Sequence, residues 1–289
     1  MTKTYEISWK NYSLKLGSRT CVMGIINVTP DSFSDGGRFL SLKDAVAHGE
    51  KLALEHADIL DVGGESTRPF SDPVSAEEEI RRVVPVIEEL AKRVNIPISV
   101  DTTKAVVAKK ALDAGASIIN DVSAFRVDPD MAGIAAEYKT PVILMHMLKT
   151  PKTMQKAPVY NNLIAEISGF LENAVQYAVD QGIERSKIII DPGIGFGKTF
   201  SHNFEIIKHL DQFNALNAPI LIGPSRKAFI RNALKHESVK DIGRGKHVVE
   251  IGTQAAIAAS IFNGAHIIRT HNVANTCATA KIIDAVKNA

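Results

Sequence analysis

The chain has 289 residues, of which 45% are hydrophobic and 23% are charged. This balance is typical of a folded globular protein and excludes an intrinsically disordered chain. The formal net charge of +2 is too small to predict a surface for nucleic acid or for a membrane.

Membrane insertion and secretion are not expected either. No apolar segment reaches the length of about 18 residues that a membrane span needs, and the first residues lack the apolar segment of a signal peptide. Cys21 and Cys277 lie in apolar or helical surroundings without metal-ligand spacing. We therefore expect two reduced thiols and a cytoplasmic protein.

The first structural element is expected to be a β-hairpin. Residues 5–9 and 12–16 alternate between apolar and polar side chains on either side of Lys10-Asn11. No linker rich in Pro, Gly or Ser divides the rest of the chain. We therefore expect one domain over residues 1–289, with residues 1–18 as a hairpin cap.

After the hairpin, short apolar segments alternate with longer segments of helical periodicity. The expected strands cover residues 21–26, 57–62, 97–101, 117–121, 141–146, 187–191, 219–223 and 265–269. The expected helices cover residues 42–56, a segment beginning at Ser75, and residues 103–114, 129–138, 160–181, 201–210, 248–263 and 273–287. Strands that are apolar on both faces are typical of a parallel sheet buried on both sides. Eight strand–helix units predict a (β/α)₈ TIM barrel of the α/β class, with a doubly wound open sheet as the alternative.

The helix that begins after Ser75 opens with Glu77, Glu78 and Glu79. Acidic side chains in a first turn are favoured by the helix dipole, and Ser75 is a suitable N-cap. We expect all three glutamates to face solvent.

Polar side chains stand at the end of every expected strand. They include Asn27, Glu65, Asp101, Asn120, His146, Asp191, Ser225, Lys227, Arg269 and His271. A single strand-end aspartate is equally well explained as the cap of the next helix, and His146 is expected to be a buried histidine bonded within the protein. In a barrel, however, all eight ends face one mouth. The joint pattern therefore predicts a ligand site, because charged groups at strand ends cost desolvation unless they face water or a ligand.

The charged side chains at these ends fall into two chemical groups. Asp101, Asn120 and Asp191 offer hydrogen-bond acceptors, which suit a ring with several N–H donors such as an aminopyrimidine. The cationic group suits an anion such as phosphate, and its members are Arg68, Lys227, Arg269 and His271. The residue types predict a ligand with a nitrogen-rich ring and a phosphate.

The segment from Pro192 to Thr199 ends like a phosphate-binding P-loop but is not one. The first glycine of that motif would fall at position 192, which is proline. The three alternating glycines after Asp191 instead predict close approach of a flat ligand to the backbone.

Taken together, the motifs of this chain resemble the dihydropteroate synthase family. They are MGIINVTPDSFSDGG, GGESTRP, VDTTK, IINDVSA, DPGIGFGK, SRKAFI and RTHNV, in this order from Cys21 to Asn272. The resemblance implies a barrel enzyme of folate biosynthesis. It would condense 6-hydroxymethyl-7,8-dihydropterin diphosphate with 4-aminobenzoate to give 7,8-dihydropteroate and diphosphate. It also implies Mg²⁺, a homodimer and inhibition by sulfonamides.

The resemblance also assigns residues to the expected site. It places Asp101, Asn120, Asp191 and Lys227 around the pterin, and Asn27, Arg269 and His271 around the diphosphate, with Asn27 as the metal ligand. It places Phe33, Thr67, Arg68, Pro69 and Ser225 on the aminobenzoate side and in the closing loops. Those expected to act in catalysis are Asn27, Arg68, Asp101, Lys227, Arg269 and His271.

Three other functions are considered. The runner-up is a pterin-dependent methyltransferase acting on methyltetrahydrofolate, which would need the ring-binding acceptors but neither NVTPDSFSDGG nor STRP. A non-catalytic pterin-binding relative would have lost Arg68, Lys227 or Arg269, and all three are present. A metal-dependent hydrolase would need several His and Asp ligands at strand ends, for which His146, His271 and Asp101 are the candidates.

Overall fold

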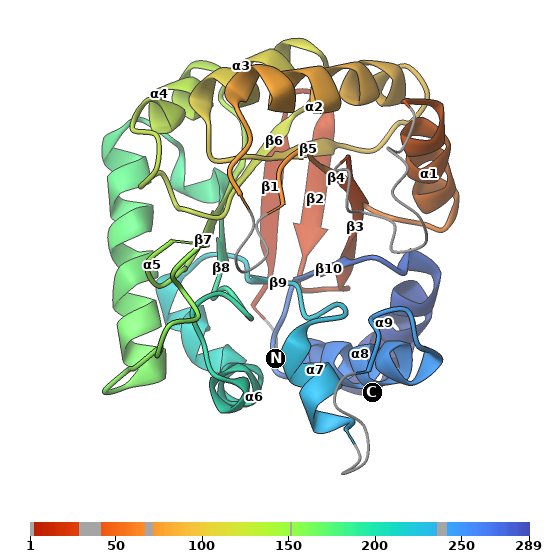
Figure 1. The fold of residues 1–289 in the computed structure, drawn as a ribbon, viewed down its shortest axis with the longest axis vertical. Helices are drawn as coiled ribbons and strands as arrows, with labels where there is room; N and C mark the ends of the chain where they lie inside the picture. Colours follow the sequence, from red (N-terminus) through yellow and green to blue (C-terminus); the bar gives the residue numbers. More distant parts are fainter. Residues whose placement is uncertain (1–2, 29–41, 67–71, 151, 236–241) are drawn as a thin grey trace.

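The eight strands after the hairpin form a barrel with helices around it. The computed structural model describes residues 3–28, 42–66, 72–150, 152–235 and 242–289. Figure 1 shows a ring of strands enclosed by helices. The sheet order is β8-β7-β6-β5-β4-β3-β10-β9 and every pairing is parallel. A bridge between Ile190 and Ile220 joins the two ends of this sheet. This arrangement confirms the barrel and excludes the open sheet.

All eight barrel strands were expected, and most agree with the prediction to within two residues. Their bounds are β3 (Cys21–Asn27), β4 (Ile59–Gly63), β5 (Ile98–Asp101), β6 (Ile118–Asp121), β7 (Val142–Met145), β8 (Ile188–Asp191), β9 (Leu221–Ile222) and β10 (Ile267–Thr270). The β9 strand is shorter than expected because Pro219 has no N–H to donate and offers only its carbonyl, which accepts from Ile190.

The helices cover the outside of the barrel. Their bounds are α1 (Leu42–Leu54), α2 (Ala76–Ala91), α3 (Ala105–Asp113), α4 (Asp130–Glu137), α5 (Leu163–Asp180), α6 (Phe200–Lys208), α7 (Ala228–Ala233), α8 (His247–Phe262) and α9 (Val273–Asn288), with 3₁₀ turns η1 (Arg185–Lys187) and η2 (Leu210–Leu216). The α7 helix was not expected, because six residues are too few to show a helical period. Among the described residues, no helix is both long and apolar enough to cross a membrane.

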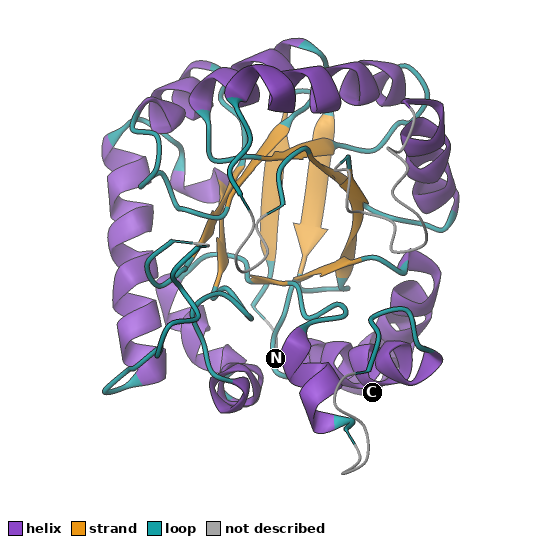
Figure 2. Ribbon diagram, in the orientation of Figure 1, coloured by secondary structure: helices purple, strands orange, loops and turns teal. Residues whose placement is uncertain are grey.

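The N-terminal hairpin closes one end of the barrel. Strands β1 (Tyr5–Trp9) and β2 (Tyr12–Leu16) pair antiparallel, as predicted, and lie behind the ring of strands in Figure 2. Ile7, Trp9, Leu14 and Leu16 are buried against inward-facing residues of the barrel, among them the first residues of β3, β4, β6 and β10. The hairpin therefore fills the end at which the strands begin, and the opposite end is left as the mouth.

Candidate active site

The expected strand-end residues lie side by side at the mouth of the barrel. Asn27 of β3 is in register with Gly63 of β4, which is in register with Asp101 of β5. Asp101 is in turn in register with Asn120 of β6. The side chains of Asn27, Asp101 and Asn120 therefore lie at one level of four neighbouring strands, with Gly63 between the first two, although up to 93 residues separate them in the sequence.

Arg269 of β10 joins this row through two carboxylates. Its Nε donates to Asp61 Oδ2 at 2.6 Å, and its Nη2 donates to Asp101 Oδ2 at 2.8 Å. Asn120 Nδ2 donates to the same oxygen of Asp61 at 3.1 Å. The second oxygens of Asp61 and Asp101 are buried and have no hydrogen-bond partner among the described residues. Because a buried carboxylate oxygen without a donor is costly, a ligand with N–H groups is the natural partner of this site.

Asp61 is a residue of this site that the sequence pattern did not predict. It lies inside β4 and is fully buried, whereas the site residues predicted from the sequence lie at strand ends. The available signal was a charged residue within an apolar strand, which is expensive unless it is paired. Asp61 links Arg269 to Asn120 and so holds both in place.

Burial shifts the pKa of Asp101 strongly upward. Removal from water favours the neutral acid and raises its pKa to about 7, against the opposing charge of Arg269. The carboxylates of Asp61, Glu79 and Asp121 add to this rise. Asp101 is therefore a carboxyl group that titrates near neutral pH at a ligand site.

If the site binds the pterin that the sequence resemblance implies, we expect the affinity for that ligand to rise with pH through about 7, the pKa of Asp101. Below that pH the protonated acid cannot accept hydrogen bonds as strongly as the carboxylate, and above it the charged acceptor is present. Calorimetric titration with a pterin between pH 6 and 8 measures the effect. Asp101→Asn should bind weakly with a flatter pH profile, and an unchanged profile would contradict the assignment.

Asp191 occupies the end of β8 and holds the loop that follows. Its Oδ1 accepts from the N–H of Gly193 at 2.7 Å, and burial raises its pKa. The alternative of helix capping does not apply to either aspartate. Helix α3 begins after Lys104 and helix α6 after Thr199, whose own side chain caps it.

The glycines of this loop have a structural reason besides ligand approach. Gly193, Gly195 and Gly197 have φ angles of +72°, +80° and +64°, which favour glycine. A Cβ at Gly193 would lie 1.8 Å from the carbonyl oxygen of His146. The loop, residues 193–197, is therefore pressed against the segment after β7, and we call it the glycine loop.

Lys227 reaches across to the glycine loop from the residue before α7. Its Nζ donates to the carbonyl of Ile194 and lies 4.6 Å from the ring centre of Phe196. Burial lowers the pKa of Lys227 to about 8, although the carboxylate of Asp191 acts in the opposite direction. The amine therefore loses its proton more readily than an exposed lysine does.

Ser225 and His271 form a pair on the same side of the mouth. Ser225 Oγ lies 2.9 Å from His271 Nδ1, and the N–H of His271 donates to Ser225 Oγ at 3.3 Å. His146, by contrast, is bonded within the protein, as expected. It is buried, its Nδ1 lies 2.9 Å from Lys198 Nζ, and burial lowers its pKa to about 2.

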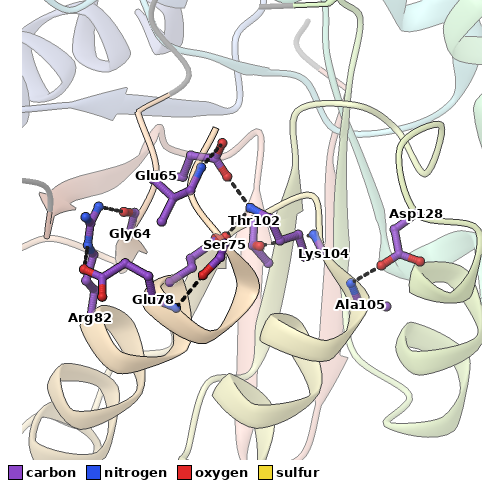
Figure 3. A network of polar contacts seen from close by, with 11 residues as sticks. Gly64, Glu65, Ser75, Glu78, Arg82, Thr102, Lys104, Ala105 and Asp128 are labelled. Carbon is purple, nitrogen blue, oxygen red and sulfur yellow. Dashed lines mark hydrogen bonds and ion pairs between the residues drawn. The ribbon is translucent and has the colours of Figure 1, made fainter. Parts of the chain in front are cut away.

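A polar network anchors the segment that follows β4, as Figure 3 shows. Lys104 donates to Glu65 and, at 2.6 Å, to Oε2 of Glu79. Glu65 also accepts from the N–H of Val74 at 3.3 Å, and Arg82 donates to the carbonyl of Gly64 at 2.8 Å. These bonds tie the two flanks of the segment to α2 and to the start of α3.

This network corrects one expectation about α2. Ser75 does cap the helix by accepting from the N–H of Glu78. Glu79, however, does not face solvent, because its side chain is fully buried beside Lys104. Helical periodicity explains the difference: Glu79 falls on the same face as Val83 and Val86, which pack into the core.

Four expected site residues lie outside the described residues: Phe33, Thr67, Arg68 and Pro69. Their assignments remain predictions. Within the described residues no group of three or more His, Cys, Asp and Glu side chains is arranged to hold a metal ion.

A barrel mouth that combines buried carboxylates with an arginine and a lysine suits the class of ligand that has both a nitrogen-rich ring and an anionic group. Comparison with known proteins agrees with this class. The sequence matches the pterin binding enzyme family over residues 23–271. A dihydropteroate synthase of Bacillus subtilis (strain 168) is 42% identical over 286 residues, which cover 99% of this chain and 95% of the relative.

Two solved structures are closely similar. The Yersinia pestis dihydropteroate synthase with a sulfonamide drug has a TM-score of 0.92 and 39% identity, and the match covers 98% of this chain and all of that one. The Xanthomonas albilineans dihydropteroate synthase in complex with 7,8-dihydropteroate has a TM-score of 0.82 and 40% identity over 94% of this chain and 95% of that one. The chain belongs to the pterin-binding enzyme family. Within that family it groups with the dihydropteroate synthases, which are transferases.

Proposed function

We propose that this barrel condenses 6-hydroxymethyl-7,8-dihydropterin diphosphate with 4-aminobenzoate, giving 7,8-dihydropteroate and diphosphate. The observation that carries the proposal is the Asp61–Arg269–Asp101 cluster, which presents a buried acceptor oxygen beside a cation. The pterin ring supplies N–H donors and the diphosphate supplies the anion. The complex of the Xanthomonas relative with 7,8-dihydropteroate agrees with this choice of product.

The pterin would be held by the acceptors within the barrel. Asp101, Asn120 and Asp191 are all buried at strand ends, so they present carboxylate and amide oxygens without competition from bulk water. Hydrogen bonds from N–H groups to a carboxylate in such a place are stronger than neutral ones. These three residues therefore determine how tightly and in which orientation the ring binds.

The reaction would exchange a C–O bond for a C–N bond at the pterin methylene. The C–O electron pair leaves with diphosphate, the lone pair of the arylamine forms the new bond, and the amine then releases a proton. A neutral arylamine needs no strong base to attack. The main demand is stabilisation of the leaving group, for which Arg269 and His271 are the described candidates and Arg68 is a further one.

Mg²⁺ is part of the proposal, with Asn27 as its protein ligand. The amide oxygen of Asn27 is a hard donor at the end of β3, and a single such donor suits Mg²⁺, which keeps several waters and substrate oxygens. When bound, the ion would neutralise charge on the diphosphate. By binding the ion, Asn27 would hold it at the mouth of the barrel.

We further propose a homodimer in the cytoplasm. Exposed apolar side chains gather on the packed helices α8 and α9, where Ile251, Phe262 and Ile282 are 56%, 61% and 64% exposed. A second copy is a suitable cover for them. Cys21 and Cys277 are free thiols, which suit a reducing compartment. Sedimentation of the purified protein should give twice the monomer mass of 31.3 kDa.

The activity is tested by mixing the protein with Mg²⁺, the pterin diphosphate and 4-aminobenzoate and measuring diphosphate release. Omission of any one component should abolish release, and a sulfonamide should inhibit it in competition with aminobenzoate. The runner-up, methyl transfer from methyltetrahydrofolate, would be favoured if no diphosphate appeared and a methyl group were transferred instead.

A further inference from the structure

The glycine loop is held by side chains from several segments of the chain. Each carbonyl oxygen from Ile194 to Gly197 accepts a hydrogen bond from a side chain. The donors are Lys227 to Ile194, Gln155 to Gly195 at 2.7 Å, Lys198 to Phe196 at 3.0 Å, and Tyr160 to Gly197 at 2.9 Å. Four successive carbonyls satisfied in this way fix the backbone of the loop, which has no helix or sheet bonds to do so.

Three consecutive residues of this loop surround Lys227. The carbonyl of Ile194 accepts from its ammonium group, and the ring of Phe196 lies beneath that group. Between them, a Cβ on Gly195 would lie 2.9 Å from Cδ of Lys227. The backbone of Gly195 therefore packs directly against the aliphatic part of the Lys227 side chain.

Gly195 is held on both of its polar groups. Its N–H donates to Asn203 Oδ1 at 2.6 Å, and its carbonyl accepts from Gln155 Nε2. Asn203 is buried in α6. Gln155 is half-buried and comes from the segment between β7 and α5, where the neighbouring Met154 is fully buried in a small cluster with Met145 and Met147. Gln155 thus connects a segment that is anchored in the core to the Gly195 backbone on which Lys227 packs.

We propose that Gln155 is a positioning residue that fixes Lys227 in the pterin site through the Gly195 peptide. This inference rests on the proposed function, because it assumes that Lys227 faces the pterin diphosphate. Without the amide of Gln155 the carbonyl of Gly195 loses its side-chain donor. The N–H bonds of Gly195 to Asn203 and of Phe196 to Gly193 then still hold this part of the loop, but the backbone against which Lys227 packs is held less firmly. The ammonium group then samples positions in which it does not contact the ligand.

The test is a double-mutant cycle on binding of 6-hydroxymethyl-7,8-dihydropterin diphosphate, measured by calorimetry. Gln155→Leu should weaken binding about tenfold, as expected for the loss of one hydrogen bond to a part-buried acceptor. In a protein that already carries Lys227→Met, the same change should have no further effect. Lys156→Met is the matched control, because its side chain is exposed next to Gln155, and it should bind like the unaltered protein.

A pH profile provides a second readout that a purely structural role would not move. Burial holds the pKa of Lys227 at about 8 in the intact site. A loosened loop admits water, which should raise the pKa of Lys227 toward that of an exposed lysine. The pH at which loss of the Lys227 proton weakens pterin binding should therefore be higher in Gln155→Leu.

Two results would overturn the inference: unchanged affinity in Gln155→Leu, or the same tenfold loss with and without Lys227. Binding without formation of dihydropteroate would overturn the proposed function alone. Absence of binding to the unaltered protein would overturn both.

Discussion

Replacement of Arg269 by alanine should slow product formation by about two to three orders of magnitude, a loss typical of removing one group that stabilises developing charge. Pterin affinity, measured at a pH above the pKa of Asp101, should fall much less, because the ring acceptors remain. Near neutral pH the loss of the Arg269 charge also raises the pKa of Asp101 and favours its neutral form. The comparison is made with single-turnover rates at saturating substrate and with calorimetric affinities. Equal losses in the two quantities would contradict a role for Arg269 in departure of diphosphate.

The same change should also lower the free energy of unfolding. Arg269 contacts both Asp61 and Asp101, and its removal leaves two buried carboxylates without their cation. Loss of one partner from a buried ion pair typically costs about 3–5 kcal/mol. Asp61→Asn together with Arg269→Met is the control: it should regain part of the stability without regaining turnover, which separates the two roles.

For Asp191 the main expected loss is in pterin affinity. Asp191→Asn keeps an acceptor for the N–H of Gly193 but removes the charge, and loss of a charged hydrogen bond should weaken binding about 10- to 100-fold. Asp191→Ala should weaken it further, because the N–H of Gly193 also loses its partner. Turnover at saturating substrate should change little.

The matched control for Asp191 is Asp211→Asn, the same chemical change at an exposed position of η2. It should leave affinity unaltered. Calorimetry that finds Asp191→Asn indistinguishable from the unaltered protein would refute the assignment of Asp191 to the pterin ring.

The sequence was sufficient to predict the barrel and the row of strand-end residues. Asn27, Asp101 and Asn120 could be placed together because parallel strands in a barrel end at one mouth, so position in the chain translates directly into position in space. The strand whose length differed most from the prediction is β9, with two residues in place of five, because its pairing depends on where Pro219 meets β8. Sequence patterns locate the helices and strands well, but they do not give the exact hydrogen-bond pairing between neighbouring strands.

Partnerships between side chains were not predictable in the same way. Glu79 and Lys104 lie 25 residues apart on different elements, and Asp61 meets Arg269 only after the barrel has closed. Gln155 gave no signal, because a lone glutamine in a long loop has no distinctive pattern. Such contacts depend on which strands become neighbours and on where each side chain points.

Within the described residues, the hairpin closes the end of the barrel opposite the candidate site. With Ile7, Trp9, Leu14 and Leu16 packed into that end, the mouth is the end through which the proposed reactants and products would pass. If the proposed pterin binds beside Asp101 and the aminobenzoate lies nearer the mouth, the bound aminobenzoate would block departure of the pterin. The closed end of the barrel would then set the order of binding. The pterin would bind before the aminobenzoate, and the two would leave together as the condensed product.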